Sequence, residues 1–309
     1  MVFKWDVRDM EHTQIFFQMY KHLLILYKDL DIRPGIVMAD VRCGSGRFAL
    51  DVAKGLQGDC KIIAMYNPEE YTKPKESITW MQERAEEYIL SGSIEFREGR
   101  PSKLADVLGD YQYNITYEFC LMTNNPDKRI VEQMARITRS GGSVVCVETG
   151  PLKYHEFLCP LNKELAELDK ELSRIETDEA FAEKFGGDMH IHEKIPYWLD
   201  ELGLDVKSRP CILAEPFSDP EIVKHKFKDW EVSHPVPRYT PKEIVSYIQG
   251  KLNMMNRQLE QDREMFKEKT LDWYSMRKEL LENLMSNPSM IKGSGIFSSD
   301  SLMIITGKK

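Results

Sequence analysis

Residues 36–48, with the sequence IVMADVRCGSGRF, restrict the possible folds of this chain more than any other segment. A short apolar run typical of a strand meets a turn of small residues, and a helix-compatible stretch begins at once. Gly44 and Gly46 lack a Cβ atom, so the backbone can turn tightly there and bring its N–H groups close to a ligand. Such a turn is typical of nucleotide and nucleoside sites at the first crossover of a parallel sheet, although ordinary strand–helix turns also use glycine.

Further apolar runs follow, and polar, helix-compatible segments separate them. The runs are 61–66, 93–97, 113–120 and 143–147, the helix-like segments include 76–90 and 127–139, and glycine-containing residues 139–142 break the chain before the last run. Strands that alternate with helices predict a doubly wound parallel sheet. Ligands bind at the edge where the strands have their carboxyl ends. The residues expected at this edge are Cys43, Asn67, Arg100 and 117–120.

The order of these motifs resembles the class I S-adenosylmethionine-dependent methyltransferases. The resemblance is carried by 40–46 (DVRCGSG), by 114–121 with 126–127, and by 134–142 (MARITRSGG). It implies an α/β fold with a doubly wound, mostly parallel seven-stranded sheet (Rossmann-like methyltransferase fold) and a helical accessory insertion. Residues 205–213 and 301–306 would be the antiparallel sixth and seventh strands that close the sheet.

The same resemblance implies a cofactor, S-adenosyl-L-methionine, and a direct methyl transfer to a small molecule or a short peptide. The cofactor-binding residues would be Asp40, Arg42, Cys43, Gly44, Gly46, Asn67, Arg100 and Glu118. Tyr117, Glu118 and His155 are the catalytic candidates, because Tyr117 and Glu118, like Tyr154, would lie close to the methyl acceptor and His155 is a possible acid–base group near the carboxyl end of the fifth strand. We expect no metal, since His190 and His192, two residues apart on a helix, would diverge by about 200°.

Two positions depart from the pattern of the family. The family usually has an acidic residue after the second strand, where it binds the ribose hydroxyls, but this chain has Asn67, with Glu69 or Glu70 as substitutes. The family often has an acidic residue after the third strand, where this chain has Arg100. Three readings stay open: ordinary drift, a modified cofactor with an added acidic group, or a noncatalytic methyltransferase-fold protein for binding or scaffolding.

The composition limits which partners the chain is expected to bind and in which compartment it is expected to lie. The formal net charge of −8 over 309 residues argues against a nucleic-acid-binding surface. No stretch approaches the ~20 apolar residues that span a bilayer, and the first residues lack the apolar segment of a signal peptide. The six cysteines include no C-x-x-C pair, so we expect reduced, apolar cysteines. These features predict a cytoplasmic protein without a membrane partner.

Helical segments outside the sheet complete the expected organisation. Residues 161–185 and 241–286 carry apolar stripes, and the latter segment starts at the capping sequence TPKE. Because no glycine or proline interrupts 252–286, the segment could form a helix about 50 Å long at ~1.5 Å per residue. Its stripe would be buried within the chain as a cap or lid, or against a second copy in a homodimer. The expected division is a helical lid (1–30), an α/β domain (31–215 with 296–309) and a helical insertion (216–295).

Overall fold

The computed structural model describes residue 7 and residues 32–110, 112–119, 126–154, 186–188, 190–214, 241–265, 268–287 and 299–309. The expected helical lid over 1–30, apart from residue 7, and the apolar stripe over 161–185 lie outside these residues, as does His155. The chain divides into two compact units. One contains Met1–Thr149, Phe185–Pro210 and Met303–Lys309, and the other contains Gly150–Lys184 and Cys211–Leu302. Each unit is described by itself below.

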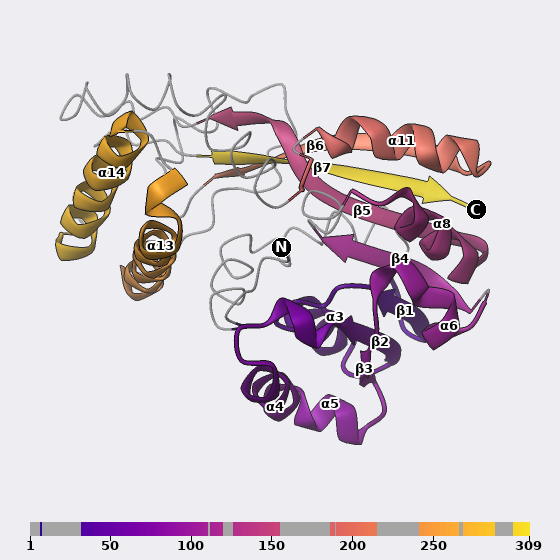
Figure 1. The fold of residues 1–309 in the computed structure, drawn as a ribbon. Helices are drawn as coiled ribbons and strands as arrows, with labels where there is room; N and C mark the ends of the chain where they lie inside the picture. Colours follow the sequence, from indigo (N-terminus) through magenta and orange to yellow (C-terminus); the bar gives the residue numbers. More distant parts are fainter. Residues whose placement is uncertain are drawn as a thin grey trace. The chain divides into compact units, whose positions relative to one another are not determined.

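The expected doubly wound, mostly parallel sheet is confirmed. Seven strands follow the order β3-β2-β1-β4-β5-β7-β6 (Figure 1). Their bounds are Ile36–Asp40 (β1), Cys60–Tyr66 (β2), Ile94–Glu98 (β3), Tyr113–Phe119 (β4), Thr138–Tyr154 (β5), Asp205–Ala214 (β6) and Ser299–Lys308 (β7). The pairs β1–β2, β1–β4, β2–β3 and β4–β5 are parallel, so β1 to β5 all end at the same edge.

The last strand runs against its neighbours. The Gly141 N–H donates to the Lys309 carbonyl at 2.8 Å, and the Lys309 N–H donates to Gly142 at 3.0 Å, so the end of β7 meets the start of β5. The Thr306 hydroxyl donates to the Lys207 carbonyl at 3.4 Å, near the start of β6. Therefore β6 and β7 are antiparallel to each other, as the sequence indicates.

The sequence predicts that the glycine pair Gly141–Gly142 breaks the chain before β5. The pair instead lies inside this strand. Tyr113 of β4 pairs with Thr138, whereas Ile115 pairs with Ser143, so β5 carries a bulge between the two pairs. Gly141 has a φ of +74°, which a glycine adopts readily. The bulge absorbs the extra residues without ending the strand.

Short helices connect the strands of the first unit. They are α3 (Arg47–Gly55), α4 (Pro74–Arg84), α5 (Glu86–Leu90), α6 (Leu104–Leu108), α8 (Lys128–Ile137) and α11 (Ile191–Glu201), with 3-10 turns η1 (Pro68–Glu70) and η2 (Pro101–Lys103). The single helix expected over 76–90 is two helices, because the backbone leaves the helical region at Ala85. The helix expected over 127–139 is α8, and the Asp127 carboxylate accepts from the Arg129 N–H to cap it.

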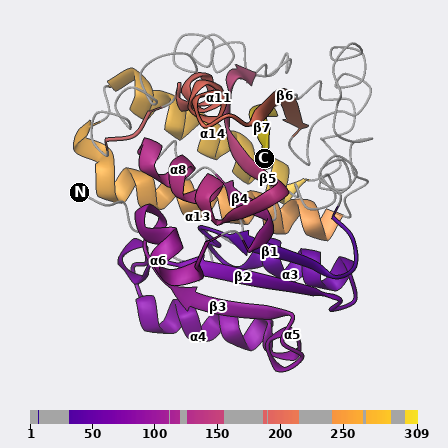
Figure 2. The same cartoon turned by 90° about the vertical axis from the view of Figure 1, so that its right-hand side faces the viewer.

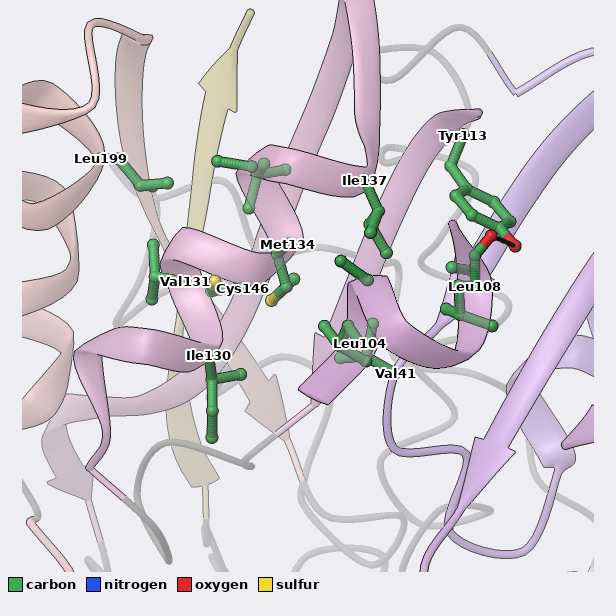
Figure 3. Packing of buried hydrophobic residues seen from close by; sticks show 14 of the residues in the cluster. Val41, Leu104, Leu108, Tyr113, Ile130, Val131, Met134, Ile137, Cys146 and Leu199 are labelled. Carbon is green, nitrogen blue, oxygen red and sulfur yellow. Dashed lines mark hydrogen bonds between the residues drawn. The ribbon is translucent and has the colours of Figure 1, made fainter. Parts of the chain in front are cut away.

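Helices cover both faces of the sheet in this unit. The buried cluster on one face joins α6, α8 and α11 to β1, β4 and β5. Figure 3 shows part of it, including Leu104, Leu108, Ile130, Val131, Met134, Ile137, Cys146 and Leu199. On the other face, the Phe48 ring of α3 stacks on Tyr117 of β4. Figure 2 shows β1, β2 and β3 side by side, as their register requires.

The second unit contains a helical hairpin in place of one long helix. Helix α13 spans Pro241–Asp262, the 3-10 turn η3 spans Arg263–Met265, and α14 spans Glu268–Ser286. The two helices pack together, and their buried residues include Ile248, Leu252, Met255, Tyr274, Leu281 and Leu284. The expectation of a continuous helix over 241–286 is therefore wrong. Helix α13 ends within the polar run 260–264, and the contact between α13 and α14 lets apolar residues of the two helices be buried together. In the described part of the chain, no helix combines the length and apolarity that a bilayer crossing demands.

Candidate functional site

The glycine turn, residues 41–46, joins the carboxyl end of β1 to α3. Gly44 and Gly46 have φ values of +57° and +73°, so both lie in the region that favours glycine. The Gly46 N–H donates to the Cys43 carbonyl at 2.7 Å, and the Gly46 carbonyl accepts the Leu50 N–H, the first bond of the helix. A Cβ atom on Gly46 would lie 3.0 Å from the Phe96 ring. The turn therefore needs glycine, and it brings the N-terminus of α3 to the ligand-binding edge.

Asp40, the last residue of β1, carries a buried carboxyl group at the carboxyl end of the strand. Its side chain is 2% exposed, and neither oxygen accepts a hydrogen bond of ordinary geometry from the residues that the structure describes. Burial raises the pKa of Asp40 from 3.8 to about 8, and the nearby Arg42 backbone N–H opposes this shift only in part. Buried polar groups are normally hydrogen bonded. A ligand that donates a hydrogen bond beside the glycine turn would satisfy Asp40.

The catalytic candidates Tyr117 and Glu118 lie on opposite faces of β4. The Tyr117 and Phe48 rings stack with centroids 3.9 Å apart, and Tyr117 is opposite Asp40 in the register of β1 and β4. Glu118 is fully buried on the other face, opposite Cys146 of β5. Tyr117 thus neighbours Asp40, whereas Glu118 points to the face that α8 covers. The catalytic roles of Tyr117, Glu118 and His155 stay predictions.

The loop after β2 contains the substitute acceptors considered for the ribose. The Asn67 side-chain oxygen accepts the Glu69 N–H at 3.2 Å and caps η1. Glu70 accepts a 2.7 Å hydrogen bond from Arg42 Nε, and these side chains are 12% and 11% exposed. Asn67 is therefore used locally, and Glu70 is the more buried of the two glutamates.

Arg100, after β3, forms an ion pair with Glu69. Its guanidinium lies 2.8 Å from the Glu69 carboxylate, and the side chains are 61% and 59% exposed. Arg42 and Arg100 thus each have a carboxylate partner within this chain. The two arginines are thus explained without an acidic group on the ligand.

Sequence reasoning missed Tyr71. Its hydroxyl donates to the Gly44 carbonyl at 2.7 Å, and the side chain is 2% exposed. Burial raises the pKa of Tyr71 well above its ordinary value, so the hydroxyl keeps its proton and remains a donor. A tyrosine in a polar loop gives no pattern that points to this contact.

Cys43 lies in the glycine turn, whereas His190, among the described residues, lies outside it. Cys43 is buried, and burial together with Asp40 and Glu70 raises its thiol pKa well above the ordinary value. The thiol is therefore a neutral filler of the turn. His190 precedes α11, where its Nδ1 lies 3.3 Å from the Glu193 carboxylate. In the ranges that the structure covers, no three histidine, cysteine or acidic side chains are placed to hold a metal ion.

The chain is similar to curated proteins and to solved structures that are named as methyltransferases. No family model matches the chain. Demethylmenaquinone methyltransferase of Oceanobacillus iheyensis is 25% identical over 178 residues, which cover 54% of this chain and 70% of that protein. The protein of the same name from Bacillus cereus is 24% identical over 144 residues, 43% of this chain and 56% of that protein. The chain thus spans between 56% and 70% of the length of these two relatives.

A solved structure gives a likeness over most of the chain. The putative sarcosine dimethylglycine methyltransferase from Galdieria sulphuraria is 12% identical, with a TM-score of 0.47, and the match covers 94% of this chain and 86% of that one. The curated relatives are named as methyltransferases, and the strand order observed here is the doubly wound, mostly parallel seven-stranded sheet that the resemblance implies. The resemblance that the motifs indicate is therefore confirmed.

Proposed function

We propose that this protein is an S-adenosylmethionine-dependent methyltransferase that acts on a small molecule or a short peptide by direct methyl transfer. The observation that carries the proposal is the buried Asp40 carboxyl group beside the glycine turn, which accepts no hydrogen bond of ordinary geometry from the described residues. The cofactor has an ammonium group and ribose hydroxyls, which are hydrogen-bond donors for such a group. The names of the curated relatives support the same cofactor class.

The chain offers donors and acceptors for the cofactor around the same edge. The backbone of Gly44 and Gly46 allows close approach, and Asp40 accepts hydrogen bonds. Glu70 is the stronger acceptor for ribose hydroxyls after β2, because a carboxylate binds donors more tightly than the Asn67 amide. Arg42 orients Glu70 for this role.

When bound, S-adenosylmethionine supplies an electrophilic methyl group. The protein contributes alignment of the acceptor and exclusion of water, which favour such a displacement more than acid–base help does. The buried Phe48–Tyr117 stack beside Asp40 supplies an apolar wall for this purpose.

Calorimetric titration with S-adenosylmethionine and S-adenosylhomocysteine tests the proposal. Wild-type protein should bind both compounds, and Gly44→Val should abolish binding while leaving the protein folded. Gly35→Val is a matched control, because Gly35 also has a positive φ (+78°) but precedes β1 at the opposite end of the strand. Unchanged affinity in folded Gly44→Val protein would refute the proposed site.

The second candidate function is a noncatalytic methyltransferase-fold protein for binding or scaffolding. Asn67 favours it, because its side-chain oxygen caps η1 where the family usually has a ribose-binding acid. Cofactor binding without turnover of any acceptor would support this candidate. A modified cofactor with an acidic group is less well supported, since Arg42 and Arg100 already have carboxylate partners.

The proposal also includes the location, the partners and the assembly of the enzyme. We infer a cytoplasmic protein whose partner is its methyl acceptor, with no nucleic acid and no membrane, in keeping with the net charge of −8. A homodimer through the helical insertion is the proposed assembly, and its test is given with the predictions below.

A further inference from the structure

The loop after β2 contacts the turns on both sides of it. Tyr71 donates to Gly44 and Glu70 accepts from Arg42, each at 2.7 Å, so two consecutive residues reach the glycine turn. Glu69 pairs with Arg100 beyond β3. A second tie comes from β2 itself, where the Met65 carbonyl accepts the Cys43 N–H at 2.8 Å. The glycine turn is thus held from the side of β2 by both backbone and side chains.

The Tyr71 hydroxyl is buried and well placed to control the backbone at Gly44. Its oxygen lies 2.7 Å from the Gly44 carbonyl oxygen and 3.9 Å from the sulfur of Met81 in α4. A buried donor that loses its acceptor carries a desolvation cost, so the hydroxyl favours the conformation in which the Gly44 carbonyl faces it.

The orientation of this carbonyl determines the direction of a neighbouring donor. The Gly44 carbonyl and the Ser45 N–H belong to one planar trans peptide group, in which they point in opposite directions. Glycine at position 44 would allow the group to rotate, because no Cβ atom restricts its backbone. By accepting from Tyr71, the carbonyl fixes the Ser45 N–H in the opposite direction.

We propose that Tyr71 is a positioning residue that holds the glycine turn in its cofactor-binding conformation, with the Glu70–Arg42 pair as a second tether. The consequence for binding rests on the proposed function, whereas the tether itself can be tested without a cofactor. Tyr71 need not touch the cofactor to act in this way.

Tyr71→Phe removes only the hydroxyl, and Tyr113→Phe is the matched control. Tyr113 is also buried and also donates to a backbone carbonyl, that of Leu108 at 3.4 Å. However, it lies at the amino end of β4, away from the edge where the glycine turn lies. Hydrogen exchange of the unliganded protein should become about tenfold faster at residues 43–47 in Tyr71→Phe, as expected for the loss of one hydrogen bond. Exchange at these residues should not change in Tyr113→Phe.

Calorimetry on the same two variants measures the consequence for binding. Tyr71→Phe should weaken S-adenosylhomocysteine binding by about five- to tenfold, while Tyr113→Phe binds as wild type does. If Tyr71→Phe does not fold, hydrogen exchange at residues 43–47 in unliganded Glu70→Gln tests the second tether, and its affinity is left aside because Glu70 is itself a proposed ribose acceptor.

The possible outcomes distinguish a failure of the Tyr71 tether from a failure of the proposed cofactor. Unchanged exchange at 43–47 in folded Tyr71→Phe would overturn the tether. Faster exchange with unchanged affinity would overturn its role in binding. If wild-type protein binds neither S-adenosylmethionine nor S-adenosylhomocysteine, the proposed cofactor fails, and the exchange rates alone then support or overturn the tether.

Discussion

Asp40 and Tyr117 are opposite each other in the register of β1 and β4, at the edge where the glycine turn begins. Tyr117 gives its ring to a stack with Phe48 and its backbone carbonyl to the Val41 N–H at 2.9 Å. The Asp40 carboxyl group, by contrast, accepts no hydrogen bond of ordinary geometry from the described residues. The packed Tyr117 ring and the Asp40 carboxyl group, which the described residues leave unsatisfied, together define where a ligand with hydrogen-bond donors would fit.

Asp40 should make the stability of the unliganded protein fall as the pH rises. Its pKa is raised from 3.8 to about 8, so the folded state keeps a proton that the unfolded chain releases. The stabilising contribution is complete below pH 3.8 and is lost as the pH rises toward 8, by up to ~1.4 kcal/mol per pH unit. Urea unfolding at pH 5, 6, 7 and 8 should show this slope in wild type and a flatter profile in Asp40→Asn. Parallel profiles would show that Asp40 does not titrate in this range.

The two ion pairs of η1 should differ in their effect on stability. Glu70→Gln breaks a pair that is nearly buried and should destabilise the protein by on the order of 2 kcal/mol. Glu69→Gln breaks an exposed pair and should cost less than about 1 kcal/mol. Chemical denaturation in low and high salt measures both, and only the Glu69→Gln difference should disappear at 1 M salt, where the Debye length is about 3 Å. Equal losses of unfolding free energy in Glu70→Gln and Glu69→Gln would contradict the difference expected between a nearly buried and an exposed ion pair.

Tyr117 can be tested separately for packing and for catalysis. Tyr117→Phe keeps the ring on Phe48 and should change stability by less than about 1 kcal/mol, whereas Tyr117→Ala should cost about 3 kcal/mol or more. Once an acceptor is found, the methyl-transfer rate of Tyr117→Phe shows what the hydroxyl contributes. A rate at least tenfold lower would confirm the predicted catalytic role, and a wild-type rate would assign Tyr117 to packing alone.

The stripe on α13 should be required for stability. Replacing Leu252, Met255 and Leu259 together by serine should lower the melting temperature strongly, because the first two side chains are buried and truncating one buried Leu or Met costs about 2–5 kcal/mol. Glu260→Ser, an exposed change on the same helix, is the control. Light scattering then tests the proposed homodimer. A halved mass in the triple variant would assign part of the stripe to a dimer contact, and an unchanged melting temperature would show that the stripe is not buried.

Local residue patterns were sufficient to predict strands such as β1 and β2 and the glycine turn that follows β1. The apolar runs at 36–40 and 61–66 lie in β1 and β2, and the glycines at 44 and 46 adopt the positive φ that their residue type favours. Such features depend on neighbours in the chain. Helix ends were harder to predict, as the break in 241–286 shows, because they depend on which apolar faces meet after folding.

The amino-acid sequence alone was enough to predict a parallel sheet, the edge at which its strands end and the glycine turn at that edge. It could not establish that Glu70 pairs with Arg42, that Glu69 pairs with Arg100, or that Tyr71 holds Gly44. These partners are 28, 31 and 27 residues apart along the chain. They meet only because parallel pairing of β1, β2 and β3 brings their three carboxyl ends together, and no local periodicity specifies which side chains then come within hydrogen-bonding distance.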